Sequence, residues 1–491
     1  MPQDLPKQIT NTLAAFAELV ETALPQWQQA RDPVAVKEME QAIAGATRAL
    51  SDQLTAQVLG HIVADPALQA QASAAARQAG RYRSGGKREV EATLLGGGRV
   101  RLPVEYLKPD RRQSKGRKKS KRGKGGSGLY PVLAVLGISL GVTPALVAEV
   151  CAQAADSDSL RAAKAALARR GIELGLRRSQ RIVNQFSGRT VQQREQWLEQ
   201  MRTQPAQAGP LRGKRIVVSM DGGRLRERRS SGRGRRRQAT GRRRYDAPWR
   251  EPKLFTIYIL KPDGTVDQAY RPVYDGTLGD CEELFSMLYG YLKALGAHEA
   301  QQVVFVADGA LWIWERTGSL AHRLGLPPER VVEVIDWCHA VAVLHDIVNE
   351  RVGWTEQERQ RWLRRAKRWL HAGDLSALLL AIDTLSKEIS PHRDYFARNA
   401  ARMQYQGFVD AKVPTGSGTV ESAVRRVINM RLKSNGMFWL EASAEGMLLL
   451  RSYLKAGHFD ALVDWSLCAA VPWWHFEGRP SSPLSFPTAA S

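Results

Sequence analysis

The sequence has few cysteines, few acidic residues for its length and no long apolar run. Its four cysteines, Cys151, Cys281, Cys338 and Cys468, are far apart and show no paired spacing. This pattern argues against a disulfide framework and a cysteine zinc site, and it fits a reducing cytoplasm. No apolar stretch approaches the roughly 18–20 residues of a membrane span. The N-terminus has no basic segment followed by an apolar one, so we expect neither a membrane partner nor a secretory signal.

Basic residues outnumber acidic ones by a wide margin. The 491 residues include 72 Lys and Arg against 49 Asp and Glu, which gives a formal net charge of +23. An excess of this size favours a polyanionic partner, with nucleic acid as the first choice. Hydrophobic residues make up 43% of the chain, which is enough for sizeable cores and excludes global disorder. At about 100–200 residues per domain, the length suggests about three domains.

The first part of the chain is expected to be mainly helical. Residues 1–80 carry apolar side chains at helical spacing. Residues 81–128 begin with alternating apolar residues on both sides of three glycines, which is typical of a short β-hairpin. They end in a basic arm suited to binding phosphate. The basic residues assigned to DNA in this arm are Lys118, Lys119, Lys121 and Arg122.

Residues 129–210 are again expected to be helical. A helix at 160–169, a break at Gly171 and a basic helix at 176–186 resemble a helix-turn-helix. The same pattern fits a simple helical hairpin with surface arginines. This segment is therefore a possible DNA-binding domain, and packing between the two helices is the alternative.

Residues 211–354 alternate between predicted strands and helices. Strands are expected at 215–220, 254–260, 267–273, 303–307 and 331–335, and helices at 281–295, 311–323 and 339–350. Three consecutive strands followed by helix, strand, helix, strand and helix is the order of a ribonuclease-H-like α/β sheet. Residues 355–411 lack strand signals and indicate an all-helical insertion. Residues 412–470 are expected to complete the domain, and 471–491 to form a flexible C-terminal tail.

Two acidic residues each follow a predicted buried strand. Asp221 follows the strand 215–220, Asp308 follows the strand 303–307, and a glycine comes next in both cases. Ligands bind at the carboxyl ends of strands in α/β sheets, and glycine permits close approach. Taken alone, each Asp-Gly pair is better explained as a turn. With a third acid, the two sites favour a metal centre.

The third acid is Glu421, in the first turn of a predicted helix. The helix dipole, or an ion pair with Arg425, would also explain a carboxylate at this place. The basic residues that follow it favour a metal ligand, since they could hold phosphates. These residues are Arg425, Arg426, Arg431 and Lys433. Carboxylates suit Mg²⁺, and two such ions about 3.5–4 Å apart can clamp the oxygens of a phosphoryl transfer.

Asp336 and His339 follow the predicted strand 331–335. This position places both residues at the carboxyl end of another strand. His339 could orient a scissile phosphate or assist proton transfer. A capping or packed histidine is the alternative.

An arginine-rich loop lies between Asp221 and the next predicted strand. Arginine suits bidentate phosphate contacts, and so many like charges repel one another unless a polyanion neutralises them. We therefore expect this loop to bind the DNA backbone beside the acidic residues. Its arginines are Arg224, Arg226, Arg228, Arg229, Arg235, Arg236, Arg237, Arg242, Arg243 and Arg244.

Four segments together resemble the Kra-type insertion-sequence transposases, bacterial DDE transposases related to Mutator-like elements. They are 219–223 (SMDGG), 306–314 (VADGALWIW), 336–340 (DWCHA) and 416–423 (GSGTVESA). The resemblance covers roughly residues 130–470 and implies a ribonuclease-H-like catalytic domain with a helical insertion. It implies that Asp221, Asp308 and Glu421 are the metal-binding triad, and that Asp336 and His339 are the signature after the second acid. Residues 436–439 match a motif downstream of the glutamate.

The resemblance implies a DNA transposase that uses two Mg²⁺ or Mn²⁺ ions per active site. Its partners would be terminal inverted repeats and target DNA, bound by a homodimer or higher oligomer on the nucleoid of the bacterial cytoplasm. Many relatives carry a cysteine-rich zinc segment, but residues 80–112 contain no cysteine. The N-terminal helices, the hairpin or the basic arm would then have to recognise the terminal repeats. A catalytically silent DNA-binding protein and a metal-dependent nuclease without strand transfer remain alternatives.

Overall fold

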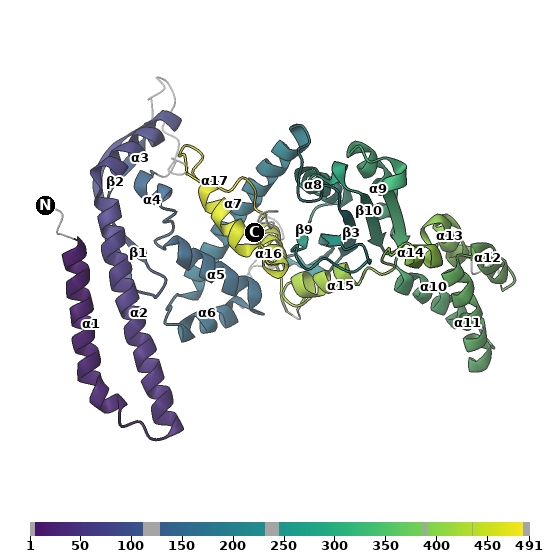
Figure 1. Ribbon diagram of the computed structural model, residues 1–491, viewed down its shortest axis with the longest axis horizontal. Coiled ribbons are helices and arrows are strands. Elements are labelled where there is room, and N and C mark those ends of the chain that lie inside the picture. Colours follow the sequence, from purple (N-terminus) through teal and green to yellow (C-terminus); the bar gives the residue numbers. More distant parts are fainter. Residues whose placement is uncertain (1–4, 111–127, 231–244, 386–389, 435, 485–491) are drawn as a thin grey trace. The chain divides into compact units, whose positions relative to one another are not determined.

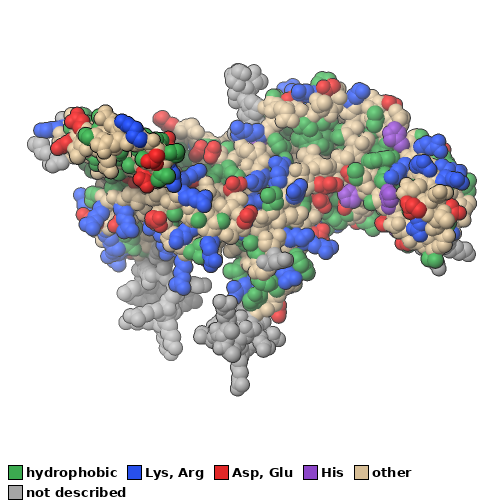
Figure 2. Space-filling view, turned by 90° about the horizontal axis from the view of Figure 1, so that it is seen from below, with side chains coloured by type: hydrophobic (Ala, Val, Ile, Leu, Met, Phe, Trp, Pro, Cys, Tyr) green, Lys and Arg blue, Asp and Glu red, His purple; other side chains and the backbone are tan. Residues whose placement is uncertain are grey.

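The computed structural model describes residues 5–110, 128–230, 245–385, 390–434 and 436–484. They fall into two compact units, the first made of Met1–Arg189 with Asp460–Pro483 and the second centred on Thr190–Phe459. Figure 1 labels most helices and some of the strands, and Figure 2 shows Lys and Arg side chains spread over one face. Within the described ranges, no helix has the length and apolar character needed to cross a membrane.

The first unit is mainly helical and is built around one β-hairpin. Its elements are α1 (Leu5–Trp27), α2 (Pro33–Ala64), α3 (Pro66–Ala79), β1 (Tyr82–Thr93), β2 (Arg99–Pro109), α4 (Pro131–Val135), α5 (Pro144–Asp156), α6 (Leu160–Arg169), the start of α7 (Leu176–Thr203) and α17 (Phe459–Ala469). The carboxylates of Asp32 and Asp65 accept hydrogen bonds from the first turns of α2 and α3, which begin at prolines. The hairpin is present and is longer than expected. Its residues Leu102 and Val104 share a core with Val63 of α2.

Two expectations for this unit need correction. The basic helix expected at 176–186 continues to Thr203, and Arg178 donates to Thr93 Oγ1 and to the Gly141 carbonyl, so Arg178 holds the hairpin in place. The expectation of a flexible tail at 471–491 needs a narrower statement, because some side chains of residues 471–484 are packed. Val471 is 3% exposed, and Trp474 packs against the hairpin core, because burial of these apolar side chains fixes the chain there.

The second unit contains a five-stranded mixed sheet in the order β11-β10-β3-β8-β9. Figure 1 labels β3, β9 and β10 of this sheet. The strands are β3 (Arg215–Gly222), β8 (Lys253–Leu260), β9 (Val273–Thr277), β10 (Gln302–Ala307) and β11 (Val331–Ile335). β3, β10 and β11 are parallel, and β8 is antiparallel to both β3 and β9. The strand expected at 267–273 was wrong. Asp267 accepts a hydrogen bond from the Ala269 amide in a turn, and the strand begins only at Val273.

Helices follow the strands of this sheet in the expected order. They are α8 (Cys281–Ala294), α9 (Leu311–Arg323), α10 (Trp337–Asn349), α15 (Gly418–Val424), a π-helical turn (Arg425–Asn429) and α16 (Glu441–Ala456), with short 3₁₀ turns at Ala297–Glu299 and Pro328–Arg330. The segment expected as a helical insertion contains α11 (Glu356–Ala372), α12 (Leu375–Asp383), α13 (Ser390–Arg398), a 3₁₀ turn (Ala400–Arg402) and α14 (Tyr405–Asp410). The described part of this segment contains no strand, as the sequence predicted.

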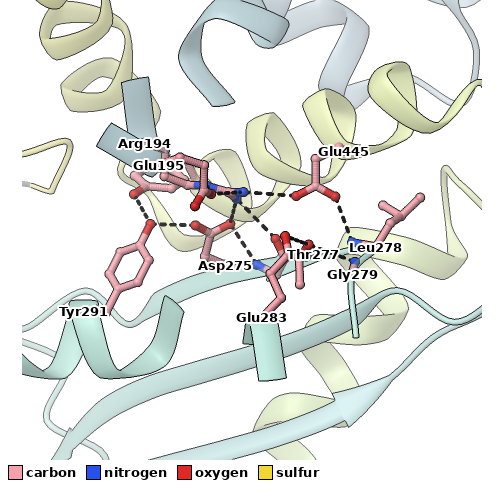
Figure 3. Close-up of polar contacts among 11 residues, drawn as sticks. Arg194, Glu195, Asp275, Thr277, Leu278, Gly279, Glu283, Tyr291 and Glu445 are labelled. Atoms are coloured by element: carbon pink, nitrogen blue, oxygen red, sulfur yellow. Dashed lines mark hydrogen bonds and ion pairs between the residues drawn. The ribbon is translucent and has the colours of Figure 1, made fainter. Parts of the chain in front are cut away.

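A buried ionic network joins α7 to the sheet (Figure 3). The side chain of Arg194, only 1% exposed, lies 2.9 Å from Asp275 of β9 and 3.0 Å from Glu445 of α16. The Tyr291 hydroxyl of α8 donates to Asp275 and lies 2.7 Å from the Tyr453 hydroxyl. Buried charges are tolerated only when they are paired, so this network fixes the positions of four elements in the second unit.

Replacing Arg194 with Met is expected to destabilise the second unit by about 3–5 kcal/mol, because it leaves Asp275 and Glu445 without their cation. Urea unfolding measures the change. The matched control on the same helix is Arg202→Met, whose partner Glu199 is 63% exposed. This surface pair should contribute at most about 1 kcal/mol. Equal losses in the two variants would contradict a special role for the buried network.

Candidate active site

The register of three parallel strands places three aspartates at one level of the sheet. Gln302 of β10 pairs with Arg215 of β3, which is 87 residues earlier, and Asp308 likewise lies 87 residues after Asp221. Val303 of β10 pairs with Val331 of β11, which is 28 residues later, and Asp336 likewise lies 28 residues after Asp308. Asp221, Asp308 and Asp336 therefore lie side by side at the carboxyl ends of adjacent strands, where α/β sheets bind ligands.

Glu421 reaches this level from the first turn of α15. Its Oε1 lies 3.8 Å from His339 Nδ1 and accepts a hydrogen bond from Ser417 Oγ at 3.2 Å. The side chains of His339 and Glu421 are 46% and 48% exposed, so both remain accessible to a ligand. Possible ligand atoms of Asp336, His339 and Glu421 all lie within 4.8 Å of one another.

Asp336 has the most constrained side chain of the group. Its carboxylate accepts hydrogen bonds from the His339 amide (2.8 Å), the His339 ring (3.1 Å) and the Ser417 amide (2.5 Å). Burial by itself would raise the pKa of Asp336, but the hydrogen bonds from His339 and Ser417 lower it to about 2. Asp336 is therefore a charged residue that fixes its neighbours, and its oxygens are already used by them.

His339 is both a cap partner and an accessible ring. The His339 amide donates to the Asp336 side chain at the N-cap of α10, which agrees with the alternative of a capping histidine. The His339 ring faces Glu421. The hydrogen bond to Asp336 raises the pKa of His339 despite partial burial, and the charges of Asp336, Asp308 and Glu421 raise it further. The ring is thus held in its cationic form over a wider pH range than a free histidine.

The triad residues act on one another electrostatically. Burial raises the pKa of Asp221 to about 6, and the charges of Asp308 and Glu421 add to this, while the Gly222 amide and His339 oppose it. One oxygen of Asp221 accepts from the Gly222 amide (2.6 Å), and one of Asp308 accepts from the Ala310 amide (3.0 Å). Of the triad, only Glu421 belongs to the group of ligand atoms within 4.8 Å. The structure thus brings the triad to one end of the sheet with Asp221 and Asp308 turned partly toward their own loops.

The donor set fits hard divalent cations. Carboxylates are the oxygen ligands that Mg²⁺ and Mn²⁺ take. Burial is the main cause of the raised pKa of Asp221, and a cation would offset the negative charges of Asp308 and Glu421 that add to it.

Tyr395, on α13 of the insertion, is a site residue that the sequence did not indicate. A Cβ built on Gly309 would lie 2.1 Å from the Tyr395 ring, so the glycine after Asp308 makes room for this ring. Burial raises the pKa of Tyr395, and the charges of Asp308 and Asp336 add to the effect. Its hydroxyl is buried and has no hydrogen-bond partner among the described residues. Tyr395 therefore has a free donor beside the acids.

The described residues on either side of 231–244 form a two-stranded arm after Asp221. β4 (Leu225–Arg226) pairs with β7 (Trp249–Arg250), and β5 (Arg229–Ser230) pairs with β6 (Tyr245–Asp246). Residues 436–439, which match the motif downstream of Glu421, are bound to the arm by two backbone hydrogen bonds. The Trp439 amide donates to the Arg226 carbonyl, and the Trp439 carbonyl accepts from the Arg228 amide. The arm therefore starts at the acidic end of β3.

The arginines of the arm divide into stacked and paired side chains. Arg226 lies 4.8 Å over the Trp249 ring, and Arg228 lies 4.5 Å over the Tyr245 ring. Arg229 forms an ion pair with the buried Glu227, so it stabilises the arm. Arg224 is exposed. The remaining predicted DNA contacts Arg235, Arg236, Arg237, Arg242, Arg243 and Arg244, with Lys118, Lys119, Lys121 and Arg122 of the basic arm, lie outside the described residues.

The basic residues after Glu421 differ in their exposure. Arg425 and Lys433 are exposed, and Arg426 donates to the Tyr274 hydroxyl at 3.1 Å. Arg431 is only 4% exposed and lies 4.9 Å over the Trp439 ring. Its burial against Trp439 leaves almost no surface for a phosphate, so the structure removes Arg431 from the predicted DNA contacts.

Without metal, Asp221→Asn is expected to raise the Tm above pH about 6 and to leave it unchanged below pH about 4. The raised pKa of Asp221 means that the folded state holds the proton more tightly than the unfolded chain. Stability is therefore lost as pH rises through this window, and the amide avoids the loss. Melting in EDTA across the pH range tests this. A similar gain in Asp410→Asn, an exposed carboxylate at the end of α14, would contradict a local cause.

No protein-family model matches this chain, and no curated protein matches it either. The chemistry of the site therefore has to be inferred from its own residues and from the positions that the fold gives them.

Proposed function

We propose that this protein is a DNA transposase that cleaves DNA strands at element ends and joins them to target DNA by two-metal-ion phosphoryl transfer. One observation carries the proposal. Asp221 and Asp308 end adjacent parallel strands at the same register level, and Glu421 reaches that level beside His339 from a separate helix. Such a convergence of distant acids is what a metal-dependent polynucleotidyl transferase needs.

The element order supports a ribonuclease-H-like catalytic unit. β3, β8 and β9 follow one another in the chain, and α8, β10, α9, β11 and α10 come next. The helical insertion lies before α15, which carries the last acid. This is also the arrangement that the resemblance to Kra-type transposases implies.

Asp221, Asp308 and Glu421 are the residues that would hold two Mg²⁺ or Mn²⁺ ions. When bound, such ions stabilise the charge on the attacking and leaving oxygens of an in-line displacement. Asp336 keeps the His339 ring and the Ser417 loop in position for this site. The accessible His339 ring can donate a hydrogen bond to a phosphate oxygen of the DNA, and the raised pKa of His339 favours the charged form that strengthens such a bond.

The basic surface supports DNA as the substrate. The arm that starts after Asp221 carries Arg226 and Arg228 on aromatic rings, and Arg425 is exposed beside the helix of Glu421. Together with the net charge of +23, these residues suit a phosphate backbone. Strand joining, as opposed to cleavage alone, and action as a dimer or higher oligomer on terminal repeats rest on the resemblance.

Asp221→Ala, Asp308→Ala and Glu421→Ala are each expected to abolish Mg²⁺-dependent cleavage and joining while DNA binding is kept. Each substitution removes a metal ligand but no residue of the basic surface. Labelled DNA carrying the inverted repeats that flank the coding sequence, incubated with Mg²⁺ or Mn²⁺, reports both products. Asp410→Ala, at an exposed position of α14, serves as the control.

The products also separate the alternatives. Cleavage without joined strands would identify a nuclease, and binding without metal-dependent chemistry would identify a silent DNA-binding protein. Normal strand transfer by all three alanine variants would refute the assignment of the site.

A further inference from the structure

One helix of the insertion carries a stripe of basic side chains that the sequence motifs did not include. Arg361, Arg364, Arg365 and Arg368 of α11 are all exposed. Their spacing of three, four and seven residues puts them on one face of the helix. We name these four residues the α11 stripe. Figure 2 shows Lys and Arg side chains gathered over the insertion, at the right of the view.

The opposite face of α11 is apolar and packed. Leu363, Ala366 and Leu370 are at most 3% exposed and face the rest of the insertion. The helix is fixed at its start by a capping box between Thr355 and Glu358 and at its end by Gly373 in the left-handed conformation. The α11 stripe therefore lies on a rigid support and not on a mobile loop.

The arginines of the α11 stripe lack close acidic partners in the part of the chain that the structure describes. None of its four arginines forms an ion pair with the described residues. Glu358 acts on Arg361 through its charge, but the carboxylate of Glu358 already accepts hydrogen bonds from the Thr355 amide and hydroxyl in the capping box. Like charges on one helix face repel one another, so the arrangement favours a polyanionic partner.

The position of α11 relative to the active site suggests which polyanion this is. α11 runs antiparallel to α10, because the His371 ring lies 5.7 Å from the Trp337 ring while Lys367 Nζ lies 3.2 Å from His345 Nε2. Trp337 directly follows Asp336, so the end of α11 lies next to the active site. Arg368 is within one helical turn of His371, and the α11 stripe leads away from the site over about 10 Å.

We propose that the α11 stripe binds the phosphate backbone of duplex DNA that continues outward from the active site. Over about 10 Å of its axis a duplex carries about six phosphate charges, enough to meet all four arginines. The binding itself follows from the charge and rigidity of α11. Its alignment with a scissile phosphate rests on the proposed function. Phosphate contacts position the duplex without reading its sequence, so the α11 stripe would not choose the element ends.

The test compares two triple variants of the full-length chain that lose the same charge. The first is R361Q/R364Q/R368Q. The control is R212Q/K261Q/R330Q, whose residues are exposed at the ends of β3, β8 and β11 that lie away from Asp221. Binding of a labelled duplex of random sequence is measured by fluorescence anisotropy in EDTA over a series of salt concentrations. A third variant, R361K/R364K/R368K, retains the charge and checks that the helix tolerates substitution.

The α11 glutamine variant is expected to bind about tenfold more weakly or worse, with a salt slope smaller by about 2–3, because each lost phosphate contact lowers the slope by about one. The control and lysine variants should keep the wild-type slope. An unchanged salt slope in the α11 glutamine variant would overturn the inference, and so would an equal loss of affinity in the control. Binding of an acidic protein or a second copy of the chain by the α11 stripe, with DNA binding intact, would also overturn it.

These outcomes are separate from the proposed function. The binding assay contains no metal, so it does not depend on the chemistry of Asp221, Asp308 and Glu421. A reduced slope in the α11 glutamine variant supports the inference even if the wild-type protein cleaves nothing. Metal-dependent strand transfer by a glutamine variant with wild-type slope would support the function and overturn the inference.

Discussion

The hydrogen bonds accepted by Asp336 are the interaction on which the rest of the site depends. This buried carboxylate joins the end of β11, the first turn of α10 and the loop before α15, because it binds the amides of His339 and Ser417 and the His339 ring. Glu421 is four residues beyond Ser417, which also binds it directly. Asp336 therefore sets where Glu421 stands relative to the two strand-ending aspartates, although its own oxygens are occupied by these neighbours.

The arrangement concentrates negative charge within a strongly basic protein. Asp221, Asp308, Asp336 and Glu421 meet at one end of the sheet, and burial together with this repulsion raises the pKa of Asp221 to about 6. Basic side chains lie on the two-stranded arm after Asp221 and in the segment after Glu421. Acidic side chains at the end of the sheet and basic side chains away from it suit a polyanionic substrate. Cations held by the acids would neutralise its reacting phosphate. The insertion contributes Tyr395 to this end of the sheet, and we propose that it also contributes the α11 stripe.

The sequence was informative where local pattern decides structure. Asp221 and Asp308 could be placed because a mainly apolar strand ends at each, and Glu421 because glycine and serine mark a helix start. Tyr395 could not be predicted, since only the folding of the insertion brings α13 against Gly309. The burial of Arg431 depends on Trp439, which the arm holds in place, and the start of β9 depends on the turn at Asp267. Pro-rich residues after 470 resembled a flexible tail, but Trp474 packs against a core formed by residues far away in the sequence.

The most direct test of the central claim is to locate the metal ions themselves. Crystals of the protein with Mn²⁺ and bound DNA, examined by anomalous scattering, should show two peaks with Asp221, Asp308 and Glu421 as ligands, about 3.5–4 Å apart. Asp336 should remain outside the coordination shell, with its hydrogen bonds to His339 and Ser417 intact. A single peak held by Asp336, His339 and Glu421, or no peak at this end of the sheet, would contradict the account.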